Sequence, residues 1–157
     1  MSWDIFVQDL PADARNVADI PDDFAPRPLM PRQALIDRIT EVVPGADFTD
    51  PAWGKIDGPD FSIEVNIGEG DPVEGFAFHV RGGDQAAGIV ADVLGHLGLR
   101  ALDMGRDDGG FFDPDDAVEN LRRWRAYRDQ VVAAASAPPA PPTDVRKPGL
   151  LGRFRRT

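Results

Sequence analysis

Residues 53–81 read WGKIDGPDFSIEVNIGEGDPVEGFAFHVR, and this stretch decides the fold. Apolar and polar side chains alternate through 61–67 and again through 76–81, the pattern of β-strands with one buried face. A short strand is predicted at 53–56, and Asp57-Gly58 after it predicts a type I′ hairpin turn, which requires positive φ. The segment 68–72 predicts a second turn. Together these features predict an antiparallel meander with one apolar face.

Working outward, the pattern predicts strands at 3–8 and 99–102, with 110–112 as the hairpin partner of the latter. A helix opens at Pro31 with a stripe of Leu35, Ile36, Ile39, Val42 and Val43. A second helix follows Asp84 as N-cap and stops at Gly98. A third follows Asp113-Pro114, with the inward residues Ala117, Leu121, Trp124, Val131 and Val132.

The resulting order is β-α-β-β-β-α-β-(β)-α. It predicts an α+β fold in which one antiparallel sheet of about four to five strands is packed on one face by two or three helices. That arrangement is the simplest one that buries all of the apolar stripes together.

The 157 residues carry 27 Asp and Glu against 17 Lys and Arg, a formal charge of −10. The charge is divided: residues 1–143 hold 12 bases and 26 acids, or −14, and residues 144–157 hold five bases and one acid, or +4. We therefore expect an acidic globular α+β domain over 1–134, a Pro/Ala-rich linker over 135–145 and a basic flexible tail over 146–157.

Composition excludes several classes of function. There is no Cys, which removes disulfides, thiolate metal sites and cysteine nucleophiles. The N-terminus has no basic region and carries Asp4 and Asp9, so we expect no secretory signal and a cytoplasmic protein. No run of about 20 apolar residues is present. The acidic charge makes duplex DNA a poor partner for the body.

The polar side of the meander is the first candidate for chemistry. Glu64 and Asn66 are expected across from Ala77, His79 and Arg81 on the next strand. A carboxylate, an amide, an imidazole and a guanidinium on one surface suit anion binding or acid–base catalysis. The competing interpretation is an ordinary solvated sheet face.

Metal and cofactor sites have little support in the sequence. The only histidines are His79 and His96, and they lack zinc-ligand spacing. The Asp-rich stretch 103–116 lacks the EF-hand order, and turns and helix caps account for many of its acids. The glycines match neither the phosphate loop nor the dinucleotide fingerprint. We expect neither a metal nor a cofactor.

Three segments carry a resemblance: SWDIFVQDLP at 2–11, DFSIEVN at 60–66 and FHVRGGD at 78–84. They resemble a group of small bacterial α+β proteins of unknown function over about residues 1–115. More loosely, LGLRALD at 97–103 is similar to part of some immunity proteins of bacterial toxin systems. That similarity implies an acidic protein that binds a basic partner.

The sequence supports three hypotheses for function. The first is a non-enzymatic cytoplasmic binding module whose acidic body meets a basic protein through the arm 9–30 and the loop 103–116. There the Asp pairs steer association: Asp22, Asp23, Asp107 and Asp108. The second is a small enzyme or anion-binding protein that uses Glu64, His79 and Arg81.

The third hypothesis is an accessory protein that acts through its tail. Arg153, Phe154 and Arg155 place an aromatic ring among cations, which suits an anionic membrane, RNA or the chain's own acidic body. The competing interpretation of this segment is a solubilising tail.

Overall fold

The computed structural model describes residues 1–139. Its strands are β1 (Trp3–Gln8), β2 (Trp53–Asp57), β3 (Phe61–Asn66), β4 (Gly75–Gly82) and β5 (Ala101–Asp103). The helices are α1 (Arg32–Val42), α2 (Gln85–Leu97) and α3 (Ala117–Ser136), with a short 3₁₀ turn η1 (Val17–Asp19). The five strands form one antiparallel sheet in the order β2-β3-β4-β1-β5. The structure therefore confirms the predicted α+β class.

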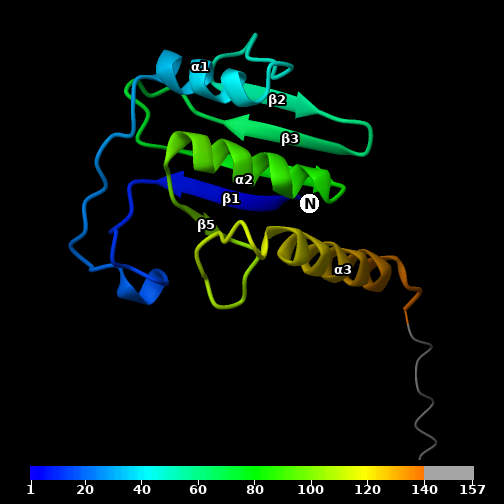
Figure 1. The fold of residues 1–157 in the computed structure, drawn as a ribbon. Coiled ribbons are helices and arrows are strands. Elements are labelled where there is room, and N and C mark those ends of the chain that lie inside the picture. Colours follow the sequence, from blue (N-terminus) through cyan, green and yellow to red (C-terminus); the bar gives the residue numbers. More distant parts are fainter. Residues whose placement is uncertain (140–157) are drawn as a thin grey trace, which may run out of the picture.

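Strand alternation sorts the sheet into two faces. Phe78 lies opposite Ile5 on one side and Val65 on the other, and all three are buried. α1 and α2 pack over this apolar face, as Figure 1 shows, and their stripes enter the same core through Leu35, Ile39 and Val90 among others. The alternate residues of the strands lie on the other face of the sheet, which we call the open face.

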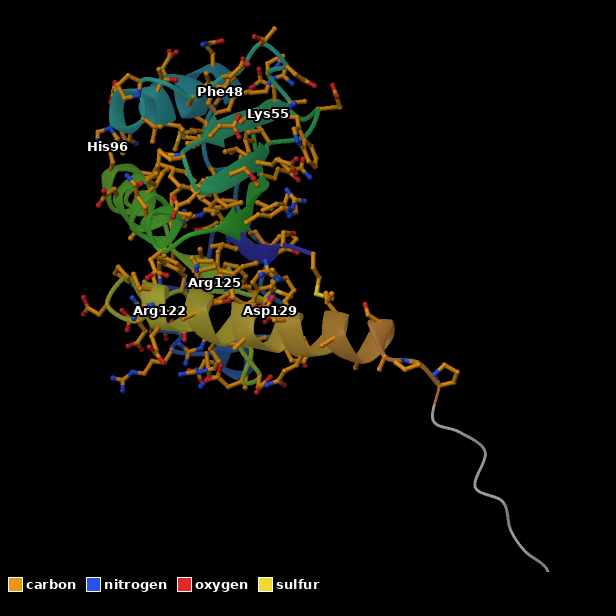
Figure 2. All side chains as sticks on the ribbon, turned by 90° about the vertical axis from the view of Figure 1, so that its right-hand side faces the viewer. Phe48, Lys55, His96, Arg122, Arg125 and Asp129 are labelled. Carbon is orange, nitrogen blue, oxygen red and sulfur yellow. The ribbon has the colours of Figure 1, made fainter. Side chains whose placement is uncertain are left out.

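Helix α3 lies beside the β1 and β5 edge and runs past the strands (Figure 2). Its first turns are anchored because Leu121 and Trp124 reach the core. Val132 is 53% exposed, so the prediction that it faces inward is wrong. Val131 beside it is half-buried.

Two local predictions need correction. Gly58 does not have positive φ, so the connection after β2 is not a type I′ turn. Gly58 precedes Pro59, whose ring favours an extended backbone at the residue before it. Asp84 precedes α2 but makes no side-chain cap hydrogen bond. In contrast, Gly98 ends α2 with φ of 64°, as predicted.

The carboxylate of Asp84 binds α3 instead of capping α2. Arg122 donates to Asp84 Oδ2 at 2.6 Å and Arg125 donates to Asp84 Oδ1 at 2.5 Å. Figure 2 labels both arginines on α3. Through these two ion pairs, Asp84 connects the start of α2 to α3.

None of the described helices combines the length and the apolar character that crossing a bilayer requires. α3 ends at Ser136, at the beginning of the Pro/Ala-rich segment. The predicted basic tail, with Arg153, Phe154 and Arg155, lies outside the described residues.

Candidate functional site

The open face brings together the polar residues that the sequence singled out. Lys55, Glu64, His79 and Asp4 form one row, because each lies opposite the next across β2, β3, β4 and β1. His79 Nδ1 lies 2.8 Å from Asp4 Oδ1. The ring of Trp53 stacks on the imidazole with centroids 5.7 Å apart. His79 is therefore held by a carboxylate and an indole.

The other two candidates, Arg81 and Asn66, lie on opposite sides of this row, because Arg81 is opposite Ser62 and Asn66 is opposite Ala77. Arg81 Nη1 lies 3.3 Å from Glu64 Oε2. The side chains of Glu64, His79 and Arg81 do not line the five cavities of residues 1–139 described here: two beside α3, one beside the end of α2, one at 67–75 and one between the arm and the loop. The groups neutralise one another on an open sheet surface. This geometry suits contact with a macromolecule better than enclosure of a substrate.

A second candidate surface joins the arm 9–30 to the loop 103–116; we call it the arm–loop surface. Asn16 forms an isolated antiparallel bridge with Gly110. Arg100 donates from Nη1 to the Pro11 carbonyl at 2.6 Å and lies over the Phe111 ring at 4.1 Å. These contacts hold two segments that are distant in sequence side by side (Figure 1).

The aspartates of this surface have different roles. Asp22, Asp23 and Asp107 are exposed and form no ion pair with any other residue of the described part of the chain. Asp108 instead binds Arg106 at 2.9 and 3.0 Å and accepts a hydrogen bond from the Gly110 N–H. The Arg106 guanidinium lowers the pKa of Asp108. Asp108 therefore shapes the loop, while the other three face solvent.

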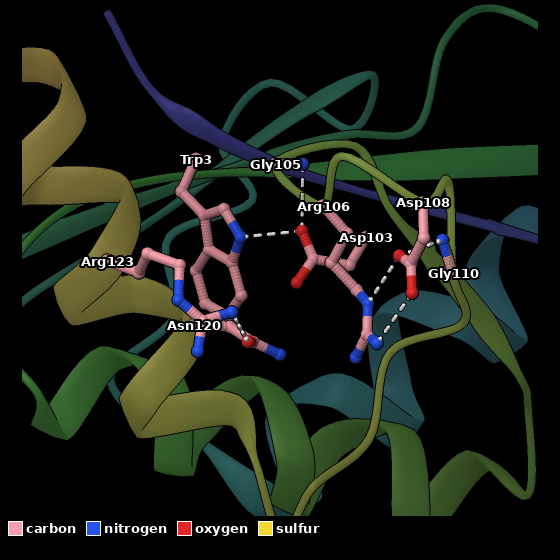
Figure 3. Close-up of polar contacts among 8 residues, drawn as sticks. All are labelled: Trp3, Asp103, Gly105, Arg106, Asp108, Gly110, Asn120 and Arg123. Carbon is pink, nitrogen blue, oxygen red and sulfur yellow. Dashed lines mark hydrogen bonds and ion pairs between the residues drawn. The ribbon is translucent and has the colours of Figure 1, made fainter.

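A third site, which the sequence did not indicate, surrounds Asp103 at the end of β5 (Figure 3). Trp3 Nε1–H donates to Asp103 Oδ1 at 2.7 Å, and the Gly105 N–H donates to the same oxygen at 2.8 Å. Asp103 is 1% exposed, and burial raises the pKa of its carboxyl despite these two hydrogen bonds. A Cβ at Gly105 would lie 2.8 Å from Trp3 Cδ1, so this close approach requires glycine.

Beside Asp103 two adjoining cavities of about 490 and 230 Å³ open between the loop and α3. We call them the loop–helix cleft. Both are lined by Gly105, Arg106, Asp107 and Arg123. Asn120 lines the smaller one, where its Oδ1 lies 3.5 Å from Arg123 Nη1.

In the sequence, Asp103 is one of several acids in an Asp-rich loop. Its special position comes from the pairing of β1 with β5, which sets Ile5 opposite Asp103 and brings Trp3 close. A hundred residues separate Trp3 from Asp103, and no local pattern links them. Only the order of strands in the sheet places the two side chains together.

Within residues 1–139 no group of three or more His, Cys, Asp or Glu side chains is arranged to hold a metal ion. His96, the second histidine, has its Nε2 at 2.7 Å from Glu41 Oε2 and so joins α2 to α1. His96 thus connects α2 to α1 through the carboxylate of Glu41.

Comparison of the chain with family models, with curated proteins and with solved structures gave no match. The features that bear on function are the open face, the arm–loop surface and the loop–helix cleft.

Proposed function

We propose that this chain is a non-enzymatic, cytoplasmic protein-binding module that holds a basic partner on its arm–loop surface. The observation that carries the proposal is the placement of its acids. Asp22, Asp23 and Asp107 are exposed and unpaired within the described residues, on segments that Asn16 and Gly110 hold together.

Some of the basic side chains around them are already engaged, since Arg100 binds arm carbonyls and Arg106 binds Asp108. Arg15 on the arm and Arg123 beside the loop form no ion pair within the described residues. Acids still outnumber bases in the arm 9–30 and the loop 103–116, so the surface carries a net negative charge. Such a field attracts a positively charged partner and raises its association rate, more strongly at low ionic strength.

The catalytic hypothesis gains less support. An enzyme needs its reactive groups to converge on a bound substrate, usually in a concave site. Glu64 and Arg81 are paired with one another, and His79 is paired with Asp4. The open face can add contact area to a protein interface, since Phe6 on β1 is 46% exposed there.

Charge reversal tests the proposal. The triple variant Asp22→Lys, Asp23→Lys, Asp107→Lys is compared with the native chain as bait, and captured proteins are identified by mass spectrometry. We expect a basic protein on the native bait that the variant fails to hold. The purified partner should then associate with the native chain at a rate that falls as salt rises.

The matched control is Glu69→Lys, Glu74→Lys, Asp92→Lys, which changes three acids elsewhere by the same total charge. This control variant should still hold the partner if the position of the acids, and not only the net charge of the chain, determines binding. Equal capture by all three proteins, or equal loss in both variants, would refute the assignment of the arm–loop surface.

A further inference from the structure

Apolar side chains form a continuous strip where the open face meets the loop–helix cleft. Phe6 and Leu102 lie opposite each other on β1 and β5, and Met104 comes two residues after Leu102, still beside β1. Met104 also lines the larger cavity of the cleft, together with Trp124 and Tyr127 of α3. We call these five residues the apolar strip. Phe6, Met104 and Tyr127 are 46%, 60% and 61% exposed.

A contiguous apolar surface bordered by polar groups is typical of a place where another segment or chain binds. The uncovered face of an antiparallel sheet is usually polar, as Lys55, Glu64 and His79 are on the other half of this one. Met104 enters the cleft from the loop and Tyr127 enters it from α3. An apolar side chain placed between them would be removed from water on two sides.

The charge beside the strip favours a basic occupant. The loop 103–116 holds six acids and one base, and Asp107 lines both cavities of the cleft. Asp107 forms no ion pair within residues 1–139, whereas Arg106 is bound to Asp108. Arg123 lines the cleft as well, so the cations of an occupant are expected nearer to Asp107. The occupant should therefore combine bulky apolar groups with positive charge.

A segment of the same chain has this composition. Residues 150–156 read LLGRFRR, which is three bulky apolar residues and three arginines in seven positions, and they lie outside the described residues. Residues 144–157 carry a formal charge of +4 against −14 for residues 1–143. The segment and the surface beside the strip are thus complementary in charge and alike in apolar character.

The chain is long enough to bring this segment back to the strip. α3 lines the cleft as far as Gln130 and ends at Ser136. Tyr127 lies about 14 Å from Ser136 along the helix axis. The 13 residues between Ser136 and Leu150 can span up to about 40 Å. A tether of this kind gives an effective concentration on the order of millimolar, so even a weak contact would be populated.

We propose that the apolar strip is the docking site of residues 150–156 of the same chain. Leu150, Leu151 and Phe154 pack against Met104 and Tyr127, and the arginines of the segment face the acids of the loop. The docking itself does not depend on the proposed basic partner. One consequence rests on the proposed function: a docked segment shields the loop acids, so the partner has to displace it.

Disulfide trapping in the full chain tests the docking without any partner, because the chain has no Cys of its own. The test pair is Gln130→Cys with Gly152→Cys, since Gln130 is exposed and lines the cleft. The control pair is Val132→Cys with Gly152→Cys. Val132 is exposed, points about 200° away from Gln130 around α3, and is nearer to the segment along the chain. Glutathione redox buffers measure the effective concentration of each pair.

We expect the test pair to have an effective concentration at least about tenfold higher than the control pair. In the test pair, Leu150→Ser, Leu151→Ser, Phe154→Ser should lower it to the level of the control pair. Tyr127→Ser should do the same, and its exposed position means that the fold is not expected to change. Val145→Ser replaces an apolar residue outside the segment and should leave the value unchanged.

Three results would overturn the proposal. Equal effective concentrations in the test and control pairs would mean that the segment has no preference for the strip. A preference that survives both the triple variant and Tyr127→Ser would mean that apolar contacts with the strip do not cause it. A disulfide that forms mainly between two chains at low micromolar concentration would assign the strip to a second copy of the chain.

Discussion

The hydrogen bond between Trp3 and Asp103 is the contact on which one end of the core depends. Trp3 is 0% exposed and its indole N–H is a principal partner of a buried carboxylate. We predict that Trp3→Phe lowers the free energy of unfolding by about 1–3 kcal/mol, because it leaves Asp103 with one donor fewer and removes buried ring volume. Urea denaturation measures this value.

The control for that substitution is Trp53→Phe on the open face. Trp53 is only partly buried and stacks on His79 without a hydrogen bond to a buried charge. Trp53→Phe should lower the free energy of unfolding by less than about 1 kcal/mol. If Trp53→Phe and Trp3→Phe lower the free energy of unfolding equally, the hydrogen bond from the Trp3 indole N–H does not account for the loss of stability.

The carboxyl of Asp103 gives a second prediction at this scale, in the pH dependence of stability. Burial raises its pKa above the ordinary 3.8, so the folded chain binds this proton more tightly than the unfolded chain does. Native stability therefore gains from Asp103 as pH falls through the raised pKa, and the gain is complete below 3.8. Asp103→Asn cannot take up the proton.

The stability of Asp103→Asn relative to the native chain should thus be highest at neutral pH and should decline as pH is lowered toward about 4. Urea unfolding of both proteins at several pH values between about 4 and 7 measures the difference. A difference that stays constant, or that grows in favour of the variant in acid, would contradict a raised pKa for this group.

At the scale of elements, one carboxylate adds ion pairs to the apolar contacts that attach α3. Asp84 holds Arg122 and Arg125, and the hydrogen bond from Arg122 lowers the pKa of Asp84. We predict that Asp84→Ala speeds amide exchange through α3 and leaves β3 and β4 unchanged, because the helix loses a link to the start of α2. Hydrogen exchange followed by mass spectrometry reads this out by segment.

Asp129→Ala is the matched control, since Asp129 binds its neighbour Arg128 within the same helix and ties α3 to nothing else in the described part of the chain. Its exchange pattern should resemble that of the native chain. Slower or unchanged exchange of α3 in Asp84→Ala would mean that the apolar contacts of Leu121 and Trp124 suffice to hold the helix.

How far the sequence predicts each element depends on how local its signal is. The alternation in 3–8 and 61–67 and the stop at Gly98 are set by neighbouring residues, and the structure confirms them. The start of α3 is later than Asp113-Pro114 implies, because Asp113 first accepts a hydrogen bond from the Asp115 N–H in a turn.

The candidate sites, too, could be predicted from the sequence only where their residues lie on neighbouring elements. The pairing of Glu64 with His79 was predictable because their strands are consecutive and one connection, residues 67–74, joins them. The site around Asp103 was not, since the indole that donates to its carboxylate belongs to Trp3, a hundred residues earlier in the chain. Sequence patterns report neighbours within about one hairpin, whereas these contacts depend on the strand order of the whole sheet.

At the scale of the whole molecule, charge is divided between the two ends of the sequence and, within the body, between paired and unpaired acids. The net charge of −10 averages a −14 region with a +4 region. Acids such as Asp84 and Asp108 serve the fold through arginine. Asp22, Asp23 and Asp107 are among the exposed acids that form no ion pair within the described residues, so they contribute to the negative surplus.

Binding of a basic protein at the arm–loop surface is tested most directly by a hydrogen-exchange footprint. The full chain is compared with and without the purified partner obtained from the capture experiment. We predict slowed exchange in residues 11–23 and 104–116 and native exchange in β2, β3 and β4. Protection confined to those three strands, with the arm and loop unchanged, would contradict binding at this surface.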